Sequence, residues 1–166
     1  MSWRAEVEQA AASLVSSRAQ RLAGVIVPMV LAADVFQDPI GFDRLYGLQI
    51  VTLEPALARG ELVIGDQHLQ PFGHVHGGVY CAIAEGLCSY ATAAVVTARG
   101  MFAVGMSNHT SFLRPATHGT LHATATRKHA GRTTWIWEVE ITDDEARICA
   151  LTRMTVAVRD LPASAD

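Results

Sequence analysis

A long apolar stretch in the middle of the chain sets the strictest limit on the fold. Residues 78–98 read "GVYCAIAEGLCSYATAAVVTA", with apolar side chains on nearly every side of a helix rather than on one stripe. Two glycines, Gly77 and Gly78, allow the backbone to turn sharply into this stretch. A helix that is apolar almost all round must be covered by other elements. The sequence therefore predicts a long helix over Gly78–Ala98, enclosed by the rest of the domain.

Six segments around this helix have the alternating pattern of β-strands. The clearest is "TTWIWEVEIT", in which Trp135 and Trp137 alternate with Ile136 and Glu138. Two predicted strands precede the helix and four follow it, at Leu48–Pro55, Ala58–Gly65, Phe102–Leu113, Thr120–Lys128, Thr133–Thr142 and Ala146–Val158. Most connections are of hairpin length, so the order β-β-α-β-β-β-β predicts an α+β fold, an antiparallel sheet with one helix on its face.

The first 40 residues carry a different pattern. Apolar residues at helical spacing, such as Trp3 and Leu14, predict an amphipathic helix that bends near Pro28. The apolar run over residues 22–35 is too short to span a bilayer, which needs about 20 residues, and starts too late for a signal peptide. We therefore expect an N-terminal helical extension over 1–40, one domain over 41–160 that opens with a short helical turn, and a tail over 161–166.

The composition narrows the class of partner. Half of the 166 residues are hydrophobic and only 17% are charged, which indicates a second apolar surface covered by a partner subunit. The formal charge of −3, without a block of like charges, argues against nucleic-acid binding, and we expect no membrane partner either. Three cysteines without a C-x-x-C pair predict reduced, buried thiols in a cytoplasmic protein. His74 and His76 lack an obvious third ligand, so no metal site is predicted.

One carboxylate, Glu85, interrupts the apolar helix. A charged acid on a buried helix face is costly unless it is paired or functional. Ser89 lies one turn further along the same face, where it can orient a water molecule or the carboxylate. The functional interpretation competes with a structural one, in which Glu85 forms a salt bridge with Arg114 or Arg153.

The start of the helix offers a second functional group. The first N–H groups of a helix have no partner within it and can bind an oxygen that becomes negative during a reaction. Gly77 and Glu85 are eight residues apart, about 12 Å along a helix, which is too far to act on one carbonyl group. Two antiparallel copies of the helix in a dimer would bring the two groups together at two equivalent sites. The alternative is that the two glycines simply form a tight turn.

Three segments resemble a known family. "QPFGHVHGGVYCAIAE", "GMSNHTSFLRPATHG" and "HAGRTTWIWEVEITDDEARICALTRMTVAVR" resemble hotdog-fold acyl-CoA thioesterases of the branch whose catalytic acid is a Glu in the central helix, especially 4-hydroxybenzoyl-CoA thioesterases. The resemblance runs roughly from Gly47 to Arg159. It implies a hotdog fold, an enzyme that hydrolyses an aromatic acyl-CoA such as 4-hydroxybenzoyl-CoA to the free acid and CoA, and a homotetramer built from dimers. It implies no cofactor, since CoA belongs to the substrate.

The resemblance also implies catalytic roles. Glu85 would be the nucleophile or general base, and the Gly77 N–H would polarise the thioester carbonyl. Gln70 and His76 would assist near the carbonyl and shape the loop. Ser89 would position the hydrolytic water from a place where the family has Thr. Taken alone, Gln70 and His76 are also consistent with side chains that only satisfy loop backbone.

A second group of residues matches positions that hold CoA. Arg114, Arg132 and Thr133 would bind its phosphates and nucleotide. Arg132 departs from the family pattern, which has a small hydroxyl residue there, although Arg is at least as good a phosphate ligand. Without the resemblance, both arginines would be read as solvated turn residues.

Other functions remain open from the sequence. The same hydrolysis could act on 1,4-dihydroxy-2-naphthoyl-CoA or on phenylacetyl-type thioesters. A hotdog hydratase would add water to an enoyl-CoA, but it would use an Asp/His pair instead of a helix Glu. A non-catalytic acyl-CoA-binding protein would bind the ester without releasing the thiol.

Overall fold

The computed structural model describes residues 41–160 of the chain. The predicted N-terminal helix within residues 1–40 and the tail over 161–166 lie outside the described residues. The helices are α3 (Gly41–Tyr46) and α4 (Gly77–Val96), with 3-10 turns η1 (Asp66–His68) and η2 (Thr97–Arg99). The strands are β1 (Gln49–Glu54), β2 (Leu57–Val63), β3 (Met101–Phe112), β4 (Thr120–Ala130), β5 (Thr134–Thr142) and β6 (Ile148–Asp160).

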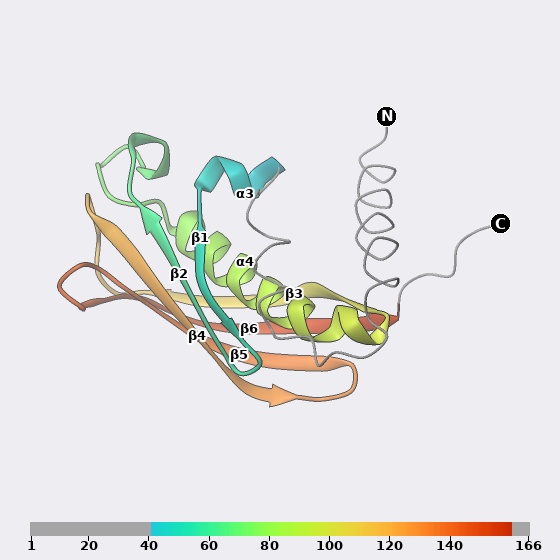
Figure 1. The fold of residues 1–166 in the computed structure, drawn as a ribbon. Helices are drawn as coiled ribbons and strands as arrows, with labels where there is room; N and C mark the ends of the chain where they lie inside the picture. Colours follow the sequence, from blue (N-terminus) through green and yellow to red (C-terminus); the bar gives the residue numbers. More distant parts are fainter. Residues whose placement is uncertain (1–40, 161–166) are drawn as a thin grey trace. The chain divides into compact units, whose positions relative to one another are not determined.

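The six strands form one antiparallel sheet in the order β1-β2-β4-β5-β6-β3. The long helix α4 lies along one face of this sheet and contacts every strand (Figure 1). The predicted element order and the hotdog architecture, a sheet around one long helix, are therefore confirmed. The predicted short helical turn before the first strand is confirmed as α3.

The element boundaries differ from the predicted ones by a few residues. The helix begins at Gly77 rather than Gly78, because His76 caps it and Gly77 already has helical geometry. Strand β4 runs to Ala130, two residues beyond the prediction, since Ala130 still pairs with Trp135. The tight turn that follows is closed by the Gly131 N–H, which donates to the Thr134 carbonyl at 3.0 Å.

The core fills the space between α4 and the sheet. The inward side chains of β5, including Trp135 and Trp137, are buried. The Trp137 indole N–H donates to the Thr92 hydroxyl at 3.0 Å, and that hydroxyl donates to the Cys88 carbonyl at 2.8 Å, so these buried polar groups are satisfied. By length and composition α4 could cross a membrane, but half of its apolar window is buried in this core, as in the central helix of a globular domain.

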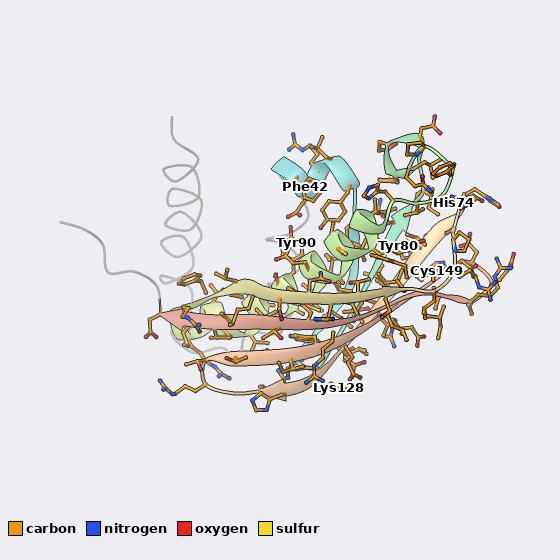
Figure 2. The ribbon with its side chains drawn as sticks, turned by 180° about the vertical axis from the view of Figure 1, so that it is seen from behind. Phe42, His74, Tyr80, Tyr90, Lys128 and Cys149 are labelled. Carbon is orange, nitrogen blue, oxygen red and sulfur yellow. The ribbon has the colours of Figure 1, made fainter. Side chains whose placement is uncertain are left out.

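The short helix α3 packs on α4 from the side away from the sheet (Figure 1). The Tyr46 hydroxyl lies directly on Gly86, where an added Cβ would be 2.4 Å from it. The Tyr90 hydroxyl donates to the Asp43 carboxylate, and Figure 2 shows Tyr90 on the side of α4 that faces α3. These two contacts place α3 over the turn of α4 that follows Glu85.

Candidate active site

Glu85 lies on a stripe of α4 that the protomer leaves open. Its side chain is exposed, contrary to the prediction of a buried carboxylate, because α4 buries only the face that packs on the sheet and α3. The Ser89 hydroxyl donates to Glu85 Oε1 at 3.2 Å. Neither arginine of the predicted salt bridge, Arg114 or Arg153, pairs with Glu85 in residues 41–160. The structural alternative to a functional acid is therefore not observed in the protomer.

The two oxygens of the Glu85 carboxylate are not equivalent. Oε1 accepts the Ser89 bond and lies 2.6 Å from the position that a Cβ on Gly105 would occupy. Oε2 has no hydrogen bond within the described residues. The charge of Glu85 contributes to raising the pKa of Tyr90, although burial of that side chain is the largest cause. The helix thus presents one anchored and one available carboxylate oxygen.

The N-terminus of α4 forms the second part of the candidate site. His76 is its N-cap, and His76 Nδ1 accepts the Gly78 N–H at 2.9 Å. The Gly77 N–H has no hydrogen bond within the part of the chain that the structure describes. The Phe112 ring covers Gly77 so closely that an added Cβ would lie 2.9 Å from it. A donor free of partners beside an apolar ring can polarise a carbonyl group.

Gln70 closes the loop before the helix. Its side-chain oxygen accepts the Phe72 N–H at 2.9 Å, and its amide nitrogen lies 2.9 Å from His74 Nδ1. The Gln70 backbone N–H donates to the His74 carbonyl at 2.8 Å. All of these contacts stay within the loop. The structure therefore brings His76 to Gly77, but it does not bring Gln70 or His76 to Glu85 in one protomer.

Sequence reasoning missed His68. This buried side chain accepts the Gly65 N–H on Nδ1 at 2.9 Å, and its Nε2 lies 3.1 Å from the Tyr46 carbonyl. Since a carbonyl only accepts, His68 Nε2 carries the proton that bonds to Tyr46. The His68 carbonyl accepts the His76 N–H at 2.8 Å, so His68 ties the helix start to the end of α3. The sequence carries no signal for it, because the Tyr46 contact spans 22 residues.

The residues predicted to hold CoA are at opposite ends of the protomer's sheet. Arg114 lies beside Cys149, whose carbonyl accepts its backbone N–H at 3.2 Å. Arg132 and Thr133 form the β4–β5 turn, and the Thr133 carbonyl accepts the Val158 N–H at 3.0 Å. Cys149 and Val158 are nine residues apart on β6, or roughly 30 Å at the rise of a strand. One protomer therefore cannot bring the two groups to one phosphate.

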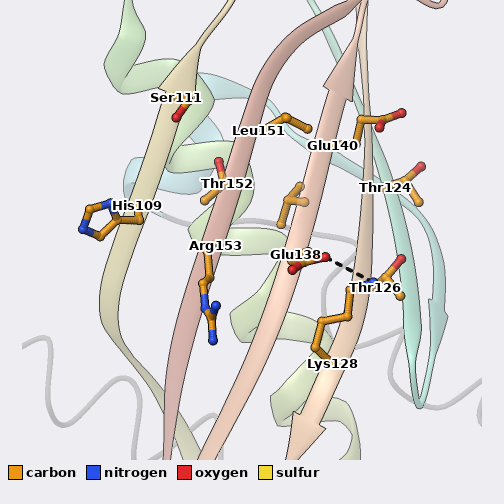
Figure 3. Close-up of a pocket in the computed structure, with 11 residues that line it drawn as sticks. His109, Ser111, Thr124, Thr126, Lys128, Glu138, Glu140, Leu151, Thr152 and Arg153 are labelled. Carbon is orange, nitrogen blue, oxygen red and sulfur yellow. Dashed lines mark ion pairs between the residues drawn. The ribbon is translucent and has the colours of Figure 1, made fainter.

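A separate pocket of about 820 Å³ lies on the other face of the sheet. It is lined by polar side chains of β3 to β6, among them His109, Thr126 and Arg153, and it contains the ion pair between Lys128 and Glu138 at 3.1 Å. Figure 3 shows these side chains pointing away from α4, which lies behind the sheet. Since Glu85 and Gly77 are on the helix, this pocket is not part of the candidate site.

Comparisons with known proteins identify the family of this chain. Residues 72–150 match the model of the thioesterase superfamily. Rv1847 of Mycobacterium tuberculosis, which carries an esterase name, is 41% identical over 113 residues, 67% of this chain and 81% of that protein. Its solved structure has a TM-score of 0.71 and 37% identity, and the match covers 75% of this chain and all of the other.

Two further relatives carry more specific names. The 1,4-dihydroxy-2-naphthoyl-CoA hydrolase of Listeria monocytogenes is 31% identical over 120 residues, 72% of this chain and 97% of that enzyme. A solved variant of the Staphylococcus aureus thioesterase SAV0944 has a TM-score of 0.68 and 26% identity, covering 70% of this chain and 97% of the other. These matches extend over most of the described domain and of each relative. The chain therefore belongs to the thioesterase superfamily and is a thioester hydrolase.

Proposed function

We propose that this enzyme hydrolyses an aromatic acyl-CoA, such as 4-hydroxybenzoyl-CoA, to the free acid and CoA. The observation that carries the proposal is the Glu85 carboxylate, which is exposed on the central helix with Oε1 held by Ser89 and Oε2 available. The relative from Listeria, whose name specifies an aromatic CoA ester, supports the substrate class. The ester of 1,4-dihydroxy-2-naphthoic acid and phenylacetyl-type esters are the alternative substrates.

The proposed catalytic unit is a dimer. Two residues of strand β3 mark the positions of the two groups. Glu85 lies against Gly105, and Gly77 lies against Phe112, seven residues further along the strand. Strand β3 is an edge of the sheet and exposes apolar side chains, including Val104, Met106 and Phe112. If β3 pairs antiparallel with its copy about an axis near residues 108 and 109, residue 105 of one protomer faces residue 112 of the other. Glu85 then meets the Gly77 N–H of the second protomer.

The same dimer would also bring together the residues predicted to bind CoA, which lie far apart in one protomer. Arg114 lies at the end of the protomer that carries Gly77, and Arg132 lies at the far end of β6. Two antiparallel protomers place Arg114 of one near the opposite end of the other. We therefore assign Arg114, Arg132 and Thr133 to the phosphates and nucleotide of CoA across the dimer. We expect such dimers to pair further into a tetramer.

Two chemical routes fit the carboxylate. In the first, a Glu85 oxygen bonds to the thioester carbon, the C–S bond breaks, the thiolate of CoA leaves and takes up a proton, and water hydrolyses the resulting anhydride. In the second, Glu85 removes a proton from water and the hydroxide bonds to the same carbon; the C–S bond then breaks, and the CoA thiolate leaves and takes up that proton. In both, the Gly77 N–H and the start of α4 stabilise the oxyanion. Ser89 holds the carboxylate in place. Neither route needs a cofactor.

A relative adds support for Gln70 and Glu85. Solved variants of SAV0944 replace one glutamine and one glutamate with alanine, and the two positions are fifteen residues apart. Gln70 and Glu85 have the same separation. In the protomer Gln70 bonds only within its loop, so we assign it the role of shaping the loop that carries His76 and Gly77.

The test is thiol release from a panel of CoA esters, namely 4-hydroxybenzoyl, benzoyl, dihydroxynaphthoyl, phenylacetyl and hexanoyl. We expect turnover of an aromatic ester, and a loss of at least about 10²-fold in Glu85→Gln because the amide cannot attack or accept a proton. Glu140→Gln, on the outer face of β5, is the matched control and should keep full activity. Turnover that survives Glu85→Gln would overturn the assignment. Binding without turnover would instead indicate an acyl-CoA-binding protein.

A further inference from the structure

Gly105 has an unusual place opposite the catalytic acid. It lies on β3 where the strand faces α4, and a Cβ built on it would lie 2.6 Å from Glu85 Oε1 and 3.3 Å from Glu85 Cγ. The same Cβ would lie 2.9 Å from the Met154 methyl group. The carboxylate therefore occupies the space that any other residue at 105 would fill. Only glycine leaves this recess open.

A β-bulge sets which residues of β3 face this part of α4. Gly105 pairs with Val156 and Ser107 pairs with Thr155, so Met106 has no partner on β6. The extra residue shifts the alternation of the strand, so that Gly105 and Asn108 both face inward. The Asn108 amide donates to the Cys81 carbonyl at 3.0 Å, one helical turn before Glu85. Strand β3 thus holds the helix turn and also leaves room for its carboxylate.

The recess determines where the Glu85 carboxylate lies, and it contributes little to the stability of the fold. The two atoms that a new Cβ would meet within 3.0 Å are the ends of flexible side chains, Glu85 Oε1 and the Met154 methyl group, and the exposed Glu85 carboxylate can move aside at little cost. Gly105 does not have a positive φ, so its backbone also accepts alanine. A methyl group there would displace Oε1 from the Ser89 hydroxyl while the fold remains intact.

We propose that Gly105 is a positioning residue for hydrolysis. Its missing side chain forms the recess that fixes Glu85 Oε1 beside Ser89, and this directs Oε2 toward the thioester. The inference rests on the proposed role of Glu85. It adds that the reactive oxygen is Oε2 and that the sheet, not only the helix, sets its direction.

The experiment combines a substitution at Gly105 with one at Ser89, whose hydroxyl binds Glu85 Oε1. Gly105→Ala should lower kcat by roughly 10- to 100-fold with little change in KM, because a displacement of about 1 Å at a reacting group has this effect. Its melting temperature should fall only slightly, because the buried Met154 methyl group has to shift. Gly60→Ala on β2 is the control: its Cβ would meet Leu48, the Gln49 carbonyl and, at an ordinary 3.5 Å, Leu87, but not Glu85, so activity per folded molecule should not change.

The second arm tests whether Gly105 acts through Glu85. Ser89→Ala removes the hydroxyl that binds Glu85 Oε1, so Gly105→Ala should cost less than roughly two-fold in the Ser89→Ala background, where that bond is already absent. Single turnovers with enzyme in excess keep these slow variants measurable. An equal loss in both backgrounds, or no loss from Gly105→Ala alone, would overturn the inference. Full activity in Glu85→Gln would instead reject the proposed function, so the two failures are distinguishable.

Discussion

Single residues determine how stability depends on pH, and His122 is the clearest case. Its Nε2 lies 3.0 Å from Asp144 and its Nδ1 lies 3.3 Å from Glu61. The hydrogen bond to Asp144 is the largest cause that raises the pKa of His122 above its usual value of 6.5. A pKa raised by folding means that the stabilisation is fully present below about pH 6.5 and is lost as the pH rises through the folded pKa.

We therefore expect His122→Gln to lower the free energy of unfolding more at pH 6 than at pH 8.5. The difference should be modest, because the pair is partly exposed and screened by solvent. Urea unfolding of both proteins at the two pH values measures it. A loss from His122→Gln that grows with pH would contradict the assignment.

At the scale of elements, α3 and α4 are joined by one close contact. The buried Tyr46 hydroxyl lies over Gly86 and has no hydrogen-bond partner among the described residues. Burial, and next the charge of Asp43, raise the pKa of Tyr46 well above its usual value, so the hydroxyl stays protonated. The glycine in the middle of α4 is therefore explained by α3, since Gly costs a helix about 1 kcal/mol relative to Ala.

Gly86→Ala should destabilise the protein by about 1–3 kcal/mol despite the better helix propensity of Ala, because the new methyl group overlaps the Tyr46 hydroxyl. Tyr46→Phe alone should be nearly neutral, since the hydroxyl it removes is unpaired. The double variant should recover most of the lost stability. Thermal unfolding of the three variants measures this. A double variant no more stable than Gly86→Ala would show that another contact explains the glycine.

At the scale of the whole molecule, the proposed site needs two protomers. The matched substitutions Val104→Lys on the β3 edge and Val63→Lys on β2 each place a charge on an exposed valine. We expect only Val104→Lys to dissociate the dimer, because a charge in an apolar interface is costly to bury. Activity should fall together with the fraction of dimer in analytical ultracentrifugation. A monomeric Val104→Lys variant with full activity would mean that one protomer holds the complete site.

Much of the fold was predictable because local patterns carry it. The apolar run around Ile83 and Leu87 identified the central helix, and the alternation around Trp135 and Trp137 identified a strand of the sheet. The predicted burial of Glu85 was wrong for the protomer, in which this side chain is exposed. A helix pattern shows which residues are apolar, but only the packing of α3 and the sheet determines which stripe stays open.

The sequence by itself determined the order of the elements and the candidate residues, because hydrophobic periodicity, glycine turns and motif spacing are properties of nearby positions. The tertiary structure alone decided how these residues meet. The recess at Gly105, the His68 bonds to Gly65 and Tyr46, and the separation of Arg114 from Arg132 depend mostly on contacts between distant segments. No local pattern encodes such contacts, since the register of the strands and the seating of α4 on the sheet create them.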